Sequence, residues 1–123
     1  MAKNTNHSVK TDIVIDLMAA TSEWGPFRTE NGGYSRNQIS FEYWSDIDCT
    51  IPAAPPSSGT MDIECSVTND TEWNRVDSSG DLPMDLSVPP STYFFVGVVD
   101  YLRFKPSAIT GPAFARIILN RYN

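Results

Sequence analysis

Hydrophobic and polar residues alternate along most of this chain, and a period of two is the pattern of half-buried β-strands. In residues 10–19, for example, Ile13, Ile15 and Leu17 share one face. The same alternation predicts strands at residues 38–44, 60–68, 72–76, 93–95, 99–104 and 113–122, with a short one near 84–88. No long window has a helical period. We therefore predict an all-β fold, an antiparallel β-sandwich or jelly-roll-like single domain.

Turn-forming residues divide the predicted strands. Gly25-Pro26 and Asn31-Gly32-Gly33 indicate a loop over residues 21–37. Residues 46–59 are rich in proline, which is excluded from helix interiors and central strands. We expect this second segment to be a long ordered loop or a crossover between two sheets.

The chain is expected to fold as one domain with an arm. Residues 1–9 are polar and without periodicity, which predicts a flexible N-terminal arm. Residues 10–123 are predicted to form the β-sandwich domain, because this length suits a single core. The strand faces give the expected core, namely Ile13, Ile15, Leu17, Ile39, Phe41, Ile63, Cys65, Val67, Trp73, Leu102, Phe104, Ile117 and Leu119.

The charge and hydropathy of the chain limit the classes of partner that we expect it to bind. The net charge is −6 and the nine Lys and Arg residues are scattered, so we expect no nucleic-acid partner. The start of the chain lacks the apolar region of a secretory signal, and no apolar run approaches the length of a membrane span. We expect a soluble protein that is made in a cytoplasm and does not bind membranes.

Few residues offer catalytic chemistry. His7 is the only histidine and lies in the predicted arm, where it would have no fixed partner for acid–base work. No serine lies in a G-x-S-x-G motif. Cys65 is predicted to be a small buried hydrophobic residue, and whether it pairs with Cys49 is left open. We therefore expect a protein that is not an enzyme and has no cofactor.

Two carboxylate groups are candidates for a hard cation such as Ca²⁺. The first is Asp46 with Asp48, and the second lies in a turn-rich loop and consists of Asp77, Asp81 and Asp85. Neither matches a defined calcium loop, and aspartate is common in turns because its side chain bonds to the nearby backbone. We expect no metal site.

The tryptophans are candidates for the core or for a contact surface. Trp24 lies in the loop over residues 21–37 with Phe27 and Tyr34, where aromatic residues either cover the end of the core or present a surface. Trp73 is expected to point inward. Trp44 is the best candidate for exposure, because its strand buries the opposite face.

Arg103 lies between two inward-facing residues and therefore points to the outer face of its strand. We expect it to pair with a carboxylate on a neighbouring strand, such as Asp100 or Glu64. Contact with a partner protein is the alternative role.

Three motifs in the second half of the chain resemble a known family. They are T-N-D-x-x-W-x-x-V from Thr68, Y-x-F-x-G-x-x-D-Y-L-R-F from Tyr93, and G-x-A-x-A-x-I-x-L from Gly111. They resemble small β-sandwich accessory proteins of tailed bacteriophage virions, and the resemblance covers roughly residues 59–119. Thr71 departs from the pattern, since members often have glycine after Asn-Asp.

The resemblance implies a non-enzymatic virion structural protein. Size and charge favour a capsid decoration (cement) protein, which binds the outer surface of the major capsid lattice and stabilises it. Its partners would be the major capsid protein and neighbouring copies of itself, as a homo-oligomer on the capsid surface of the virion, after synthesis in the host cytoplasm. The alternative is a tail, baseplate or receptor-binding β-module that binds a host surface glycan.

A decoration protein needs segments that reach its neighbours. Residues 1–8 and the proline-rich residues 50–59 are the candidate bridges, unless they are a plain arm and a plain crossover. The candidate partner contacts are His7, Trp24, Tyr34, Trp44, Pro55, Pro56 and Arg103.

Overall fold

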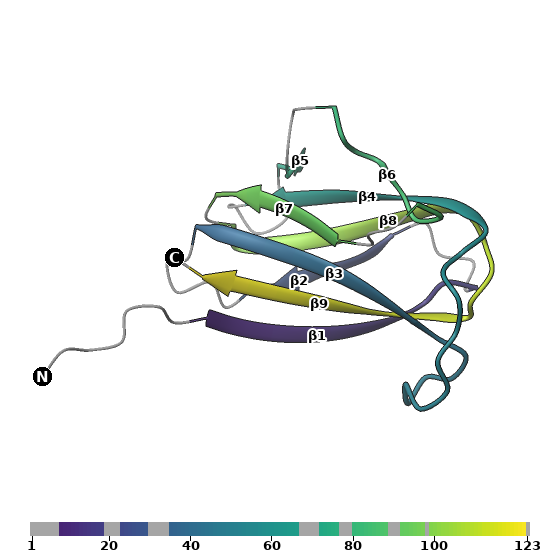
Figure 1. The fold of residues 1–123 in the computed structure, drawn as a ribbon. Coiled ribbons are helices and arrows are strands. Elements are labelled where there is room, and N and C mark those ends of the chain that lie inside the picture. Colours follow the sequence, from purple (N-terminus) through teal and green to yellow (C-terminus); the bar gives the residue numbers. More distant parts are fainter. Residues whose placement is uncertain are drawn as a thin grey trace, which may run out of the picture.

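The structure is a computed structural model, and it describes residues 8–18, 23–29, 35–66, 72–76, 80–88, 92–97 and 99–122. Two antiparallel β-sheets pack face to face as a sandwich, which confirms the predicted fold class (Figure 1). His7, Tyr34 and Val67 lie outside the described residues. Within those residues, no helix has the length and apolar character needed to cross a membrane.

In the described residues, sheet A has four strands in the order β1-β9-β3-β7. Their bounds are Ser8–Asp16 for β1, Phe114–Tyr122 for β9, Arg36–Trp44 for β3 and Thr92–Val96 for β7. The register is continuous across the two long central strands, from Arg36 opposite Tyr122 to Trp44 opposite Phe114. Strand β7 therefore forms one edge of the sheet and β1 forms the other.

Sheet B has the order β2-β8-β4-β5, and β6 pairs with the same side of β4 as β5. The bounds are Trp24–Arg28 for β2, Tyr101–Thr110 for β8, Ser58–Ser66 for β4, Asn74–Arg75 for β5 and Met84–Asp85 for β6. Strand β8 continues through Pro106. It can do so because the described part of β2 pairs with it only as far as Phe104, so no described strand pairs with Pro106 on that side.

The core lies between the sheets and follows the predicted strand faces. The predicted residues that are buried are Ile15, Leu17, Ile39, Phe41, Ile63, Leu102, Phe104, Ile117 and Leu119. Ile13 and Cys65 are partly buried against them. Phe104 is fully buried, and its ring packs 6.1 Å from Phe27 and 6.4 Å from Phe41, the latter edge to face.

Cys49 and Cys65 are free cysteines, so the two do not pair. Cys65 packs against the core, as predicted, and burial raises the pKa of its thiol. A thiol in such surroundings stays protonated at neutral pH and behaves as a small hydrophobic group.

Three local predictions were wrong. Residues 21–37 were predicted as a loop but contain β2, in which Pro26 is accommodated at a sheet edge by a register shift between Trp24 and Phe27. Strand β1 begins at Ser8, so residues 8 and 9 belong to the sheet and not to an arm. Trp73 does not point inward, because its ring lies 4.3 Å from the guanidinium carbon of Arg103 on the outer face.

Candidate functional site

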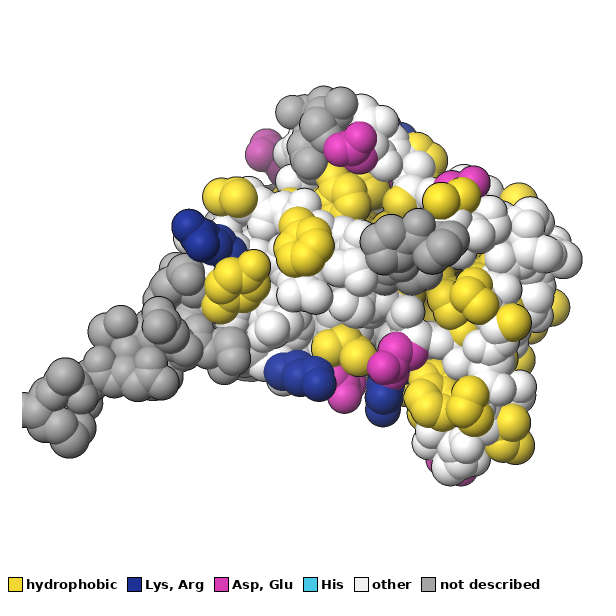
Figure 2. Space-filling view, in the orientation of Figure 1, with side chains coloured by type: hydrophobic (Ala, Val, Ile, Leu, Met, Phe, Trp, Pro, Cys, Tyr) yellow, Lys and Arg dark blue, Asp and Glu magenta, His cyan; other side chains and the backbone are white. Residues whose placement is uncertain are grey.

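Large apolar side chains are exposed on ordered parts of the molecule, and they fall into two main groups. Ile47 and Ile51, which are 64% and 57% exposed, lie in the segment that follows β3. Phe94 and Val96, which are 59% and 80% exposed, lie on the edge strand β7. Figure 2 shows hydrophobic side chains on this face of the molecule, both near the top and around the lower right. Exposed apolar groups that cluster on ordered elements are typical of protein contact surfaces.

The first group is carried by residues 45–52, which we call the tip loop. This loop hangs beyond the end of the sandwich in Figure 1. The backbone N–H of Ser45 donates to the carbonyl of Ile51 at 2.9 Å, and that of Ala53 donates to the carbonyl of Tyr43 at 3.0 Å. These bonds continue the strand pairing into the loop and close it as a hairpin.

Asp46 holds the tip loop from inside. Its carboxylate accepts hydrogen bonds from the backbone N–H groups of Thr50 and Ile51, both at 2.9 Å, and from the hydroxyl of Thr50 at 2.5 Å. These bonds lower the pKa of Asp46, with the Thr50 hydroxyl as the largest cause. The carboxylate therefore fixes the backbone that presents Ile47 and Ile51. The sequence offered Asp46 as a metal ligand; in the structure its oxygens are used by the loop.

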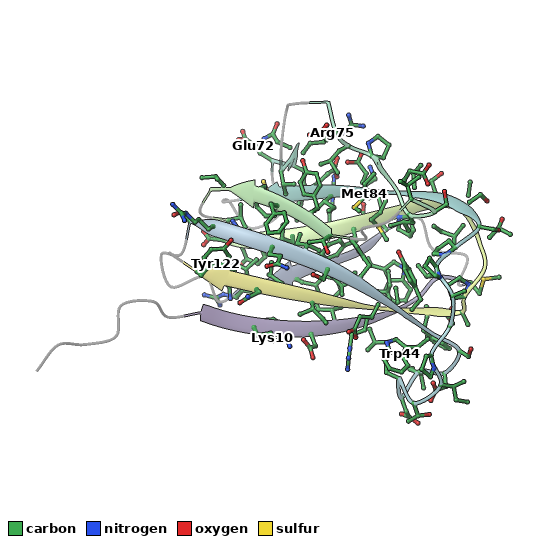
Figure 3. All side chains as sticks on the ribbon, in the orientation of Figure 1. Lys10, Trp44, Glu72, Arg75, Met84 and Tyr122 are labelled. Atoms are coloured by element: carbon green, nitrogen blue, oxygen red, sulfur yellow. The ribbon has the colours of Figure 1, made fainter. Side chains whose placement is uncertain are left out.

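Trp44 lies on the outer face of sheet A, as the alternation predicted, and is labelled in Figure 3 next to the tip loop. Its cross-strand partner is Phe114, and the guanidinium carbon of Arg116 lies 5.4 Å from its ring. Arg116 in turn donates to the Glu42 carboxylate from Nε at 2.8 Å. The indole is half-buried, and its N–H has no hydrogen-bond partner among the described residues.

Arg103 makes one of the two ion pairs proposed for it. Its Nε donates to Oε1 of Glu64 at 2.6 Å, and its Nη1 lies 3.5 Å from Oε2 of Glu23. The guanidinium also covers the ring of Trp73. These contacts tie β8 to β4 and to the start of β2, so the geometry assigns Arg103 a structural role.

The remaining predicted contact residues do not gather into one site. Trp24 is half-buried against the core. Pro55 is exposed, but Pro56 is buried beside Gly111, so its predicted place on a contact surface is not observed. Trp24 and Arg103 belong to sheet B and Trp44 to sheet A. The described members of the predicted set therefore lie on both sheets.

Sequence reasoning missed the residues that are most exposed. Tyr93–Val96 reads as four consecutive apolar residues, and the structure buries Tyr93 and Phe95 while it leaves Phe94 and Val96 in solvent. The sequence signal for this exposed surface was the presence of apolar residues at consecutive positions, which places them on both faces of the strand. The carboxylates give no metal centre: in the described part of the chain no group of three or more His, Cys, Asp and Glu side chains could hold a metal ion.

Comparison with solved structures yields a structural neighbour, whereas the two sequence comparisons yield no match. No protein-family model matches the chain, and no curated protein matches its sequence. Among solved structures, the chain is similar to the SPBc2 prophage-derived protein YomS, with a TM-score of 0.43 and 9% sequence identity over 98% of this chain and 100% of that chain.

Proposed function

We propose that this chain is a non-enzymatic structural protein of a virion, and that it decorates the outer surface of the capsid. The observation that carries the proposal is the tip loop, which holds two isoleucines in solvent on a backbone fixed by Asp46. A fixed apolar projection loses little conformational entropy on docking, which favours binding to a matching pocket. Such a projection fits protein–protein contact better than catalysis.

The repeating lattice of a capsid would strengthen attachment through small apolar contacts such as those of the tip loop. A decoration protein meets many equivalent sites, so modest contacts at each copy add to a strong total attachment. The formal charge of −6 favours encounter with a basic patch on the outer capsid surface. The repeated lattice contacts and the negative charge of the chain both support a role in which a small rigid sandwich clamps neighbouring capsid subunits.

The connectivity agrees with this role without deciding it. The chain crosses from sheet to sheet at most connections, as in jelly rolls, which are frequent in viral capsid and lectin domains. Because one fold serves many functions, the proposal rests on the tip loop and the charge.

A second candidate function is glycan binding by a tail or baseplate module. Trp44 lies beside Phe114 on the outer face of sheet A, where its indole ring is half-buried. Aromatic rings of this kind stack on sugars. A glycan screen that is positive for the wild type and silent for Trp44→Ala would favour this function over decoration.

Cryo-electron microscopy of particles of the virus that encodes this chain tests the proposal. Regular density at capsomer seams or symmetry axes, with the tip loop against the capsid, is the expected result. Density confined to the tail would favour the glycan-binding alternative. Absence of the chain from the particle would refute both virion roles.

A further inference from the structure

Among the described residues, no strand closes the side of the sandwich between β7 of sheet A and β6 of sheet B. Strand β7 pairs with β3 on one side, and no strand in the described ranges pairs with its other side. A hollow of about 520 Å³ follows this free side. Its two walls are Thr92, Tyr93 and Phe94 from β7, and Met84, Asp85 and Val88 from β6 and the residues after it. Figure 3 labels Met84 on this side of the molecule.

The backbone of β7 is suited to accept another strand. An edge strand presents N–H and C=O groups on its free side, and proteins usually protect such edges with charged residues or proline. The outer edge of sheet A at β1 carries Lys10, Asp12 and Asp16, and the edge strand β2 of sheet B carries Pro26. Strand β7 has the sequence TYFFV and carries no such residue. It is thus the least protected of these three edges.

The side chains around the hollow indicate what the added strand would contain. Phe94 and Val88 are more than half exposed, so apolar contacts are available on both walls. The charged residues of the lining are Asp81 and Asp85. Asp85 accepts hydrogen bonds from the N–H and the hydroxyl of Ser87, at 2.9 and 2.6 Å, and these lower its pKa. Asp85 therefore places a negative charge on the described lining, and this charge complements a cationic partner.

We propose that β7 binds an extended segment of a partner polypeptide, with apolar residues flanked by Lys or Arg, which joins sheet A as its next strand. The five residues of β7 span about 17 Å, enough to pair with a segment of similar length. In the virion this segment would belong to the capsid partner, and only that identification rests on the proposed function.

A second copy of the chain fits this edge less well. Two β7 edges that paired with each other would bring together two acidic linings, on molecules that each carry a charge of −6. Repulsion between the linings disfavours this arrangement, whereas a basic segment is attracted.

Titration of the isotope-labelled protein with short peptides tests the proposal without any virion. The probe is acetyl-KKLTLTK-amide, used up to about 1 mM, the range of weak peptide affinities. The first comparison peptide is acetyl-EELTLTE-amide, which reverses the charge. The second is the basic peptide N-methylated at both leucines, which keeps the charge but removes backbone donors. Backbone amide shifts of Thr92–Val96 are the readout.

The expected result is saturable shifts along Thr92–Val96 with the basic peptide alone. Asp85→Asn should weaken binding roughly threefold, as for one exposed ion pair, while the matched change Asp12→Asn on β1 should not alter it. Phe94→Ser should weaken binding further, with Val14→Ser as the control on the opposite edge.

Three results would overturn the proposal. One is the absence of shifts in β7 at the highest peptide concentration. Another is equal binding of the acidic or the N-methylated peptide, which would exclude strand pairing guided by charge. The third is self-association of the wild type through β7, since the edge would then belong to a second copy. If the peptide binds to β7 but the virion lacks the chain, the proposed strand binding at β7 is supported and the proposed decoration of the capsid is refuted.

Discussion

The double change Ile47→Ser and Ile51→Ser is the most direct perturbation of the proposed decoration surface. Fully burying one isoleucine side chain stabilises by about 1.5–3 kcal/mol. The two side chains are 64% and 57% exposed, so docking can bury only about 60% of each, roughly 1–2 kcal/mol per side chain. Together they contribute about 2–3.5 kcal/mol, which corresponds to a loss of affinity of roughly 30- to 300-fold.

Co-sedimentation of labelled protein with purified capsids measures this loss. The fold should be unaffected, because exposed positions change stability by about 0.5 kcal/mol or less, and a urea unfolding curve checks that point. Val14→Ser is the matched control, since Val14 is an exposed apolar residue of the same sheet, two strands from β3. Binding of the double variant within about threefold of wild type, with an intact fold, would refute the reasoning.

Three further predictions concern the fold and the tip loop. Phe104→Ala should lower the free energy of unfolding by about 3–5 kcal/mol in urea, because a fully buried ring leaves a cavity; a loss under 1 kcal/mol would contradict the packing. Thr29→Val should cost about 1–2 kcal/mol in the same assay, because the buried hydroxyl donates to a backbone carbonyl at 2.5 Å. The lowered pKa of Asp46 means that its contribution is present above the unfolded-state pKa and is lost as pH falls through the folded-state pKa. The protection factors of the Thr50 and Ile51 amides, which correct the exchange rate for its intrinsic pH dependence, should therefore fall in acid, whereas protection factors that stay constant would argue against the carboxylate.

The strands that sequence predicts well are those with one buried face and partners on both sides. Strand β9 alternates between buried and half-buried residues over its whole length, β3 does so after its exposed first residue, and β4 does so over most of its length. Such strands have their register fixed by the core, so the alternation in the sequence is strict. Within the described ranges, β2 has a partner strand on one side only, and it contains Gly25-Pro26, which breaks the alternation and resembles a turn.

The candidate site was less predictable, because exposure at an edge depends on which strands become neighbours. Nothing in Tyr93–Val96 alone distinguishes the buried face from the exposed one, since both carry large apolar residues. Asp46 was recognised as a candidate ligand, but its use by Thr50 and Ile51 requires the loop geometry. Trp73 precedes a strand of only two residues, too short for alternation to fix its face.

The tip loop and the β7 edge lie at different positions along β3. The distance between them bears on both proposals, because it decides whether one molecule can use both surfaces at once. The tip loop follows Trp44 at one end of β3, whereas Phe94 of the β7 edge pairs with Gln38, six positions away and about 20 Å along the strand. Surfaces this far apart on a rigid sheet can contact two different subunits at once. Occupation of one surface would then raise the effective concentration at the other. Loss of either surface should therefore reduce attachment to the affinity of the remaining surface alone, and loss of both should abolish binding to the capsid.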